Sequence, residues 1–181
     1  MHRRSLFFVG LSISLFLLSA YSAAQPCQSC LKPGDILPPL AGQALTGRSL
    51  DVESASGGKP AVVVFSFSRA GGRDAQLWTQ RLMKDDPHLA NYTVIFLESV
   101  PGLFRPIAVS GIKDGMPPVL QDRTILLYRN EDLWRQRLQV TNERNACVML
   151  LGPAGQVQWV TSGPFGDALY AEFRKSIRAL N

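Results

Sequence analysis

PAVVVFSF, residues 60–67, is a continuous run of β-branched and aromatic side chains. Such a run predicts a strand that is buried on both faces of a sheet. Residues 92–97 (YTVIFL) have the same character, and a helix is predicted between the two strands over residues 73–84, after a glycine-containing turn at 68–72. A helical connection of this length joins two strands in parallel through a right-handed crossover. The centre of the protein is therefore predicted to be a parallel β-α-β unit.

An antiparallel hairpin is predicted on each side of this unit. In residues 37–52, Leu40, Leu45 and Leu50 flank two short turn segments. A Gly/Ser-rich loop follows at 54–59. Further on, residues 146–151 (ACVMLL) and 156–161 (QVQWVT) flank the turn Gly152-Pro153-Ala154-Gly155. The other predicted elements are a strand at 124–128 (TILLY) and helices at 104–112, at 131–138 with Asn130 as N-cap, and from Pro164 to the end.

The first 24 residues have the pattern of a secretory signal peptide. Arg3 and Arg4 precede an apolar stretch at 6–18, and Ser22 and Ala24 are suitable small residues for cleavage before Gln25. The apolar stretch, about 13 residues, is shorter than the roughly 20 that a membrane-spanning helix requires. We therefore expect a signal peptide at 1–24, a cysteine-containing tether at 25–35 and one domain at 36–181, located in the periplasm or otherwise outside the cytoplasm.

The composition excludes some classes of partner. Arg3 and Arg4 account for two of the 19 basic residues, which leaves 17 against 14 acidic residues, a net charge of +3, after cleavage. There is no dense Lys/Arg run, so nucleic-acid binding has no support. No later segment is long and apolar enough to span a bilayer, so no integral membrane span is expected after cleavage.

Three segments resemble the thioredoxin-like superfamily, in particular its thiol-peroxidase and extracytoplasmic-reductase branches. They are LAGQALTGRSL (40–50), PAVVVFSFSRAGG (60–72) and VMLLGPAGQVQWVTSG (148–163). Gly152 stands where an aspartate is common in that superfamily. The resemblance implies a thioredoxin-like three-layer α/β/α fold, with a mixed central sheet and an N-terminal β-hairpin. It does not imply one activity, because a fold hosts many functions.

A narrower resemblance links residues 138–163 (LQVTNERNACVMLLGPAGQVQWVTSG) to the mitochondrial ATP synthase assembly factors. Asn142, Trp159 and Gly163 match that family's C-terminal signature, whereas Gln158 replaces its arginine. The segment at 65–82, with its Trp-Thr pair, is also similar. The resemblance implies a thioredoxin-like protein that assists the assembly of a membrane complex and is not an enzyme.

The position of the redox motif in thioredoxin-like oxidoreductases holds no cysteine in this chain. There, a Cys-x-x-Cys pair begins the helix after the first central strand, where free N–H groups and the helix dipole stabilise a thiolate. Here, that position is Ser68-Arg69-Ala70-Gly71-Gly72-Arg73. The position of the superfamily's cis-proline falls at Ala146 or Cys147. This pattern argues against a standard disulfide reductase or peroxidase.

Four residues at this position suggest a different role. Arg69, Gly71, Gly72 and Arg73 could form a helix N-terminus that receives an anion. The alternative is that the glycines permit a tight turn while the arginines face solvent.

The chain holds three cysteines after the predicted cleavage site: Cys27, Cys30 and Cys147. Cys27 and Cys30 have the spacing of a local disulfide, of a pair that exchanges with a partner, or of two ligands for Cu(I) or half a zinc site. A structural zinc needs four ligands, and His88 is a distant fourth candidate, so we assign no metal site and no cofactor. Cys147 is either a small buried hydrophobe or a lone thiol facing the vacated redox site.

Three functions follow from these residues. The favoured one is a non-enzymatic binding or assembly factor for an envelope protein or membrane complex. The second is a thiol-disulfide oxidoreductase that uses Cys27 and Cys30, with or without Cys147. The third is an extracytoplasmic copper-binding chaperone.

Overall fold

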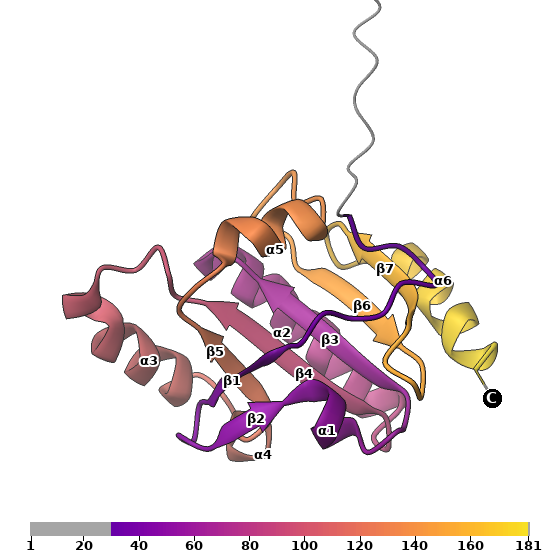
Figure 1. Cartoon of the computed structure of the whole chain (residues 1–181), viewed down its shortest axis with the longest axis horizontal. Helices are drawn as coiled ribbons and strands as arrows, with labels where there is room; N and C mark the ends of the chain where they lie inside the picture. The colour runs from indigo at the N-terminus through magenta and orange to yellow at the C-terminus, as the bar shows by residue number, and fades with distance from the viewer. Residues whose placement is uncertain (1–29, 181) are drawn as a thin grey trace, which may run out of the picture.

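A computed structural model describes residues 30–180 of the chain (Figure 1). The predicted signal peptide and Cys27 lie outside the described residues. The elements in chain order are β1 (Ala41–Ala44), β2 (Ser49–Asp51), α1 (Val52–Ser56), β3 (Ala61–Ser66), α2 (Arg69–Asp85), β4 (Ala90–Phe96), η1 (Gly102–Phe104), α3 (Arg105–Asp114), α4 (Pro118–Gln121), β5 (Thr124–Leu127), α5 (Glu131–Arg137), β6 (Cys147–Leu151), β7 (Val157–Ser162) and α6 (Asp167–Arg178).

One mixed sheet of seven strands in the order β2-β1-β5-β4-β3-β6-β7 forms the middle layer. β3 pairs with β4 in parallel, and β4 pairs with β5 in parallel. The remaining pairs are antiparallel and include both predicted hairpins, β1–β2 and β6–β7. The predicted β-α-β unit and the thioredoxin-like fold class are therefore confirmed.

Helices cover one face of the sheet, and a mixed layer covers the other. Val62 and Val64 of β3 point to the face that carries Trp78 of α2 and Phe173 of α6. Helix α3 lies on this same side, against Leu126 of β5. The opposite face is covered by α1, α5 and the N-terminal segment that leads into β1.

The N-terminal segment from Cys30 to Leu40 lies across the sheet (Figure 1). Leu31 is buried, and its N–H donates to the carbonyl oxygen of Arg137 at 2.8 Å. Further along, Gly34 N–H donates to Val157 O, and Val157 N–H donates to Asp35 O. Residues 30–35, which the sequence assigns to a tether, thus pack on the domain and cover the beginning of strand β7.

Helix α2 begins earlier than the sequence predicts. Its first residue is Arg69 and its N-cap is Ser68, so Gly71 and Gly72 lie inside the helix. The predicted turn at 68–72 was wrong. The glycine at position 71 leaves room inside the helix for the backbone of a neighbouring loop. A Cβ built on Gly71 would lie 2.7 Å from Glu143 O and 3.3 Å from Asn145 O. The loop before β6 therefore lies directly against the first turn of α2.

Three smaller predictions also need correction. Residues 52–56 form helix α1, capped by the Asp51 carboxylate, where the start of a loop was predicted. Helix α6 begins at Asp167 and not near Pro164. Asn130 precedes helix α5 as predicted, but its side chain makes no capping hydrogen bond. Instead, the Glu98 carboxylate accepts from Glu131 N–H at 2.7 Å, so a distant residue takes over the capping role.

None of the helices within residues 30–180 is long and apolar enough to cross a membrane.

Gly71 and Gly72 offer a matched test of the contact between α2 and the loop before β6. We expect Gly71→Ala to destabilise the protein by about 1–3 kcal/mol, because the new methyl group would overlap the backbone of Glu143. Gly72→Ala should be neutral or stabilise by up to about 1 kcal/mol, since its Cβ would meet only Ser66 Oγ at 3.7 Å. Urea unfolding of the two variants measures both effects. Equal stabilities would contradict the close approach.

Candidate functional site

The first turn of α2 is the position of the redox pair in thioredoxin-like oxidoreductases. In this chain, Ser68 caps the helix: its Oγ accepts from Gly71 N–H at 3.0 Å. The same hydroxyl donates to Glu143 O at 2.6 Å. The Ser68 hydroxyl is thus engaged in two structural hydrogen bonds. His88 lies beyond the other end of α2, in the turn that leads to β4, so it is not placed to activate Ser68.

A carboxylate of the second turn joins α2 to two other segments. Asp74 Oδ2 accepts from Ala146 N–H at 2.8 Å, and Asp74 Oδ1 accepts from Phe165 N–H at 2.9 Å. Ala146 begins the approach to β6, and Phe165 lies between β7 and α6. Asp74 therefore binds backbone groups at the place where the superfamily has its cis-proline. The sequence analysis missed this residue, because nothing local in the sequence marks an aspartate with distant backbone partners.

The predicted anion-binding residues lie around this closed helix N-terminus. Arg69 and Arg73 are exposed, and neither forms an ion pair within residues 30–180. Gly71 is buried under the loop before β6, and its N–H is already bonded to Ser68. The close approach of the Glu143 backbone explains why position 71 is a glycine, without an anion. An anion site at these four residues stays a prediction.

A polar network extends along the same edge of the sheet, where β3, β4 and β5 end. Glu131, at the start of α5, is only 3 % exposed. Its carboxylate accepts from Ser99 N–H at 3.2 Å and forms an ion pair with Arg135. The Glu98 carboxylate in turn accepts a hydrogen bond from Glu131 N–H. Two hydrogen bonds therefore link the segment after β4 to the start of α5.

Arg135 connects this network to the first turn of α2. It forms a second ion pair with Glu143, whose carbonyl oxygen accepts from Ser68. The Arg135 guanidinium also lies over the Phe67 ring, 5.3 Å from its centroid. The arrangement joins four separate segments through charge-assisted bonds.

Cys147 does not face the vacated redox position. It is fully buried, and its side chain joins the core cluster of the opposite face with Phe65 and Trp134. Its neighbours Ala146 and Val148 point to the α2 side. Burial raises the pKa of the Cys147 thiol, and a hydrogen bond with Ser162 only partly opposes this shift. The thiol is protonated at neutral pH, as a buried hydrophobe would be.

Cys30 lies at the surface of α5. It is disulfide-bonded, whereas Cys147 is free. Its Sγ is 3.4 Å from the carbonyl oxygen of Gln136, and the next residue, Leu31, is bonded to Arg137. The cysteine end of the tether is therefore placed beside the last turn of α5. Cys27 lies outside the described residues, so its role stays a prediction.

Residues 30–180 contain no group of three or more His, Cys, Asp or Glu side chains placed to hold a metal ion.

Asp74 tests how far the edge depends on one carboxylate. We expect Asp74→Ala to destabilise the protein by about 2–4 kcal/mol, because two buried or partly buried N–H groups would lose their acceptor. Asp74→Asn should cost less, since one acceptor oxygen remains. Asp167→Asn is a suitable control, because that side chain is 93 % exposed and its loss should cost less than about 0.5 kcal/mol. Denaturant unfolding measures the free energy of unfolding of each variant. If Asp74→Asn and Asp167→Asn lost equal stability, the role of Asp74 would be contradicted.

The buried state of Cys147 predicts slow alkylation. In the native protein, we expect iodoacetamide at pH 8 to label Cys147 far more slowly than it labels glutathione, because the thiol is inaccessible and its pKa is raised by burial. In urea, the same cysteine should react at the ordinary rate. Mass spectrometry of the labelled peptide measures both rates. Rapid native labelling would show that the thiol is accessible and would revive its role as a nucleophile.

Comparison with known proteins gives one family and many structures of the same fold. Residues 34–180 match the model of the family described as ATP10 protein. No curated protein sequence matches significantly.

Three similar solved structures are distant from this chain in sequence. The thioredoxin domain of a thiol-disulfide oxidoreductase of Bacteroides vulgatus is 22% identical, with a TM-score of 0.55, over 83% of this chain and 99% of that one. A thiol:disulfide interchange protein DsbE of Chlorobium tepidum is 14% identical, with a TM-score of 0.59, over 83% and 98%. BsSco, of the Sco family of cytochrome c oxidase assembly proteins, is 15% identical, with a TM-score of 0.54, over 82% and 98%. These likenesses show the fold.

Proposed function

Because the chain belongs to the ATP10 protein family, we propose that it is an exported thioredoxin-like assembly factor. In this proposal, it binds a protein component of an envelope membrane complex while that complex is assembled, and it performs no redox catalysis at the usual position of the fold. The family match over residues 34–180 supports the assembly role. It also agrees with the resemblance of residues 138–163 to the ATP synthase assembly factors.

One observation carries the proposal: structural bonds occupy the position of the redox pair. Ser68 caps α2 and bonds to the loop before β6, and Asp74 fixes Ala146 and Phe165. Catalysis of thiol-disulfide exchange requires a thiolate that a disulfide can approach. The first turn of α2 offers neither a thiol nor an open approach, because Gly71 lies under the backbone of Glu143.

The proposed location outside the cytoplasm has two supports. The first is the signal-peptide pattern of residues 1–24. The second is the pair Cys27 and Cys30, because their spacing suits a local disulfide and disulfides persist mainly in oxidising compartments. Fractionation of cells, with mass spectrometry of the N-terminal peptide, tests both the location and the expected cleavage before Gln25.

The disulfide of Cys30 also favours a second function, thiol-disulfide exchange from the tether. Cys30 is the first described residue of the N-terminal segment, and it is partly exposed beside α5. A disulfide that a partner thiolate can reach exchanges without an activating helix, at a rate set by access and by the pKa of the leaving thiol. In this alternative, Cys27 and Cys30 carry the activity.

Substitution of both tether cysteines separates the two functions. In a strain that lacks the gene, we expect the full-length Cys27→Ser, Cys30→Ser variant to restore at least about half of the wild-type amount of assembled complex, because the surfaces of the domain that would bind the client remain. Native gel electrophoresis of the membrane fraction measures the complex. The Cys147→Ala variant serves as a control for the removal of a cysteine as such.

Thermal unfolding of each variant keeps the interpretation unambiguous. A folded double variant that fails to support assembly would overturn the binding proposal and favour thiol exchange. If purified wild-type protein also reduced a model disulfide substrate, that conclusion would be reinforced. Stoichiometric binding of Cu(I), lost in the double variant, would instead favour the copper-binding chaperone.

A further inference from the structure

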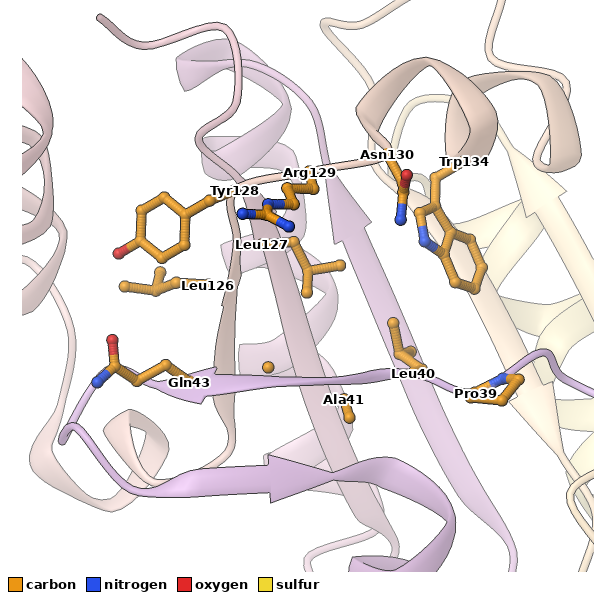
Figure 2. A pocket seen from close by; sticks show the side chains of 11 residues that line it. Pro39, Leu40, Ala41, Gln43, Leu126, Leu127, Tyr128, Arg129, Asn130 and Trp134 are labelled. Carbon is orange, nitrogen blue, oxygen red and sulfur yellow. The ribbon is translucent and has the colours of Figure 1, made fainter. Parts of the chain in front are cut away.

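Strands β1 and β5 separate after two residue pairs and leave a wedge-shaped groove between them. Gln43 pairs with Leu126, and Ala44 pairs with Ile125. Towards the start of β1, the two strands diverge, and a groove of about 370 Å³ opens at this point (Figure 2). This volume is within the usual range for sites that bind small ligands or short peptide segments.

The groove contains backbone groups that a strand partner would satisfy. In an antiparallel pair, alternate residues direct their N–H and C=O groups to the same neighbour. Leu45 N–H donates to Thr124 O, so Gln43 and Ala41 also face β5, and Leu126 and Tyr128 face β1. The pairing ends at Gln43. Within the described chain, the backbone groups of Tyr128 donate and accept no hydrogen bond, and Ala41 makes none to β5.

The groove is lined by both apolar and polar residues, and its charge has one sign. Figure 2 shows Leu40 and Trp134 at one end, Leu126 and Tyr128 at the other, and Leu127 between them. Arg129 is the one charged residue that lines the groove, and no acidic residue does. The Arg129 side chain is exposed and has no ion pair within residues 30–180. An incoming carboxylate would therefore meet an unopposed guanidinium.

We propose that this wedge binds an extended peptide segment of a client protein, with its backbone between Ala41 and Tyr128 and a carboxylate against Arg129. The inference rests on the proposed assembly function and names the surface that would hold the client. Addition of a strand to open sheet edges is a common mode of peptide recognition, in which main-chain bonds give affinity and side-chain pockets give specificity. The directional backbone groups favour a polypeptide over a lipid or another small apolar molecule.

The geometry also explains why the wedge stays open in the chain alone. Pro38 and Pro39 precede β1, and Pro39 has no N–H to donate to a ladder. Leu40 is 2 % exposed and anchors this stretch to the core beneath α5. Residues 39 and 40 are therefore held away from β5 by their own packing, and β1 cannot close on β5 without removing Leu40 from the core.

The direct test uses a blocked pentapeptide of alternating valine and threonine with a central glutamate, and the protein purified after expression of the full-length sequence. We expect nuclear magnetic resonance shifts at Ala41, Leu127, Tyr128 and the Trp134 indole. Two altered peptides separate the contributions: glutamine in place of glutamate removes the charge, and N-methylation of alternate amides removes the backbone donors. An unblocked pentapeptide without glutamate tests whether a C-terminal carboxylate serves equally.

We expect N-methylation to abolish binding and glutamine to weaken it by up to about fivefold, the effect of one exposed charge pair. In the Arg129→Gln protein, the glutamate and glutamine peptides should bind equally. Arg178 of α6 is exposed and forms no ion pair within residues 30–180, so Arg178→Gln is the matched control and should keep the preference for glutamate. Shifts at the outer edges of β2 or β7 instead of the wedge would overturn the proposal. So would binding that N-methylation leaves unchanged, or an absence of binding.

Assembly in cells distinguishes this inference from the proposed function. Arg129→Gln should lower the amount of assembled complex in the complemented strain, whereas Arg178→Gln should not. If the wild-type gene supports assembly but Arg129→Gln has no effect and the peptides do not bind, the wedge proposal fails and the assembly function stands. If loss of the gene leaves the complex intact while the peptides bind the wedge, the assembly function fails and the peptide site stands.

Discussion

Complete burial of strand β3 is the constraint on which the rest of the structure depends. All six of its residues are inaccessible or nearly so, although they point alternately to two faces. Burying both faces requires an apolar layer on each side of the sheet. Helices α2 and α6 supply one layer through Trp78 and Phe173. The second layer has fewer helical residues, so the segment around Leu31 and Leu37 completes it.

This need for a second layer gives the N-terminal segment a structural role. Leu31 is buried under α5, and its backbone is bonded to Arg137. Cys30 is the next residue towards the N-terminus, and its sulfur lies beside Gln136. The cysteine of the tether is consequently positioned by the packing of the domain.

The edge where β3, β4 and β5 end shows how a thioredoxin-like fold can exist without its redox site. In place of a thiolate, the first turn of α2 has a serine cap and an aspartate that holds two distant backbone groups. The ion pairs of Arg135 connect the same edge to α5 and to Glu143. These bonds fix the first turn of α2, the loop before β6 and the start of α5 relative to one another. Elsewhere, the wedge between β1 and β5 has backbone groups at Ala41 and Tyr128 that form no bond across it within residues 30–180.

The sequence by itself determined the elements whose pattern is local. The β-branched and aromatic runs at 60–67 and 92–97 identified the parallel strands, and the turn at Gly152–Gly155 identified the last hairpin. The absence of cysteine from 68–73 excluded the usual redox pair at that position. These features depend on side-chain periodicity and residue type, which a sequence displays directly.

Tertiary structure alone decided the features that depend on contacts between distant segments. Position 71 of α2 requires a glycine because the backbone of Glu143 passes close to it. Helix α5 is capped by Glu98 and not by the adjacent Asn130. Asp74 acquires its partners 72 and 91 residues away. The wedge likewise arises because burial of Leu40 holds the start of β1 away from β5. No local pattern records such contacts, since their free energy depends on which chain segments the fold brings together.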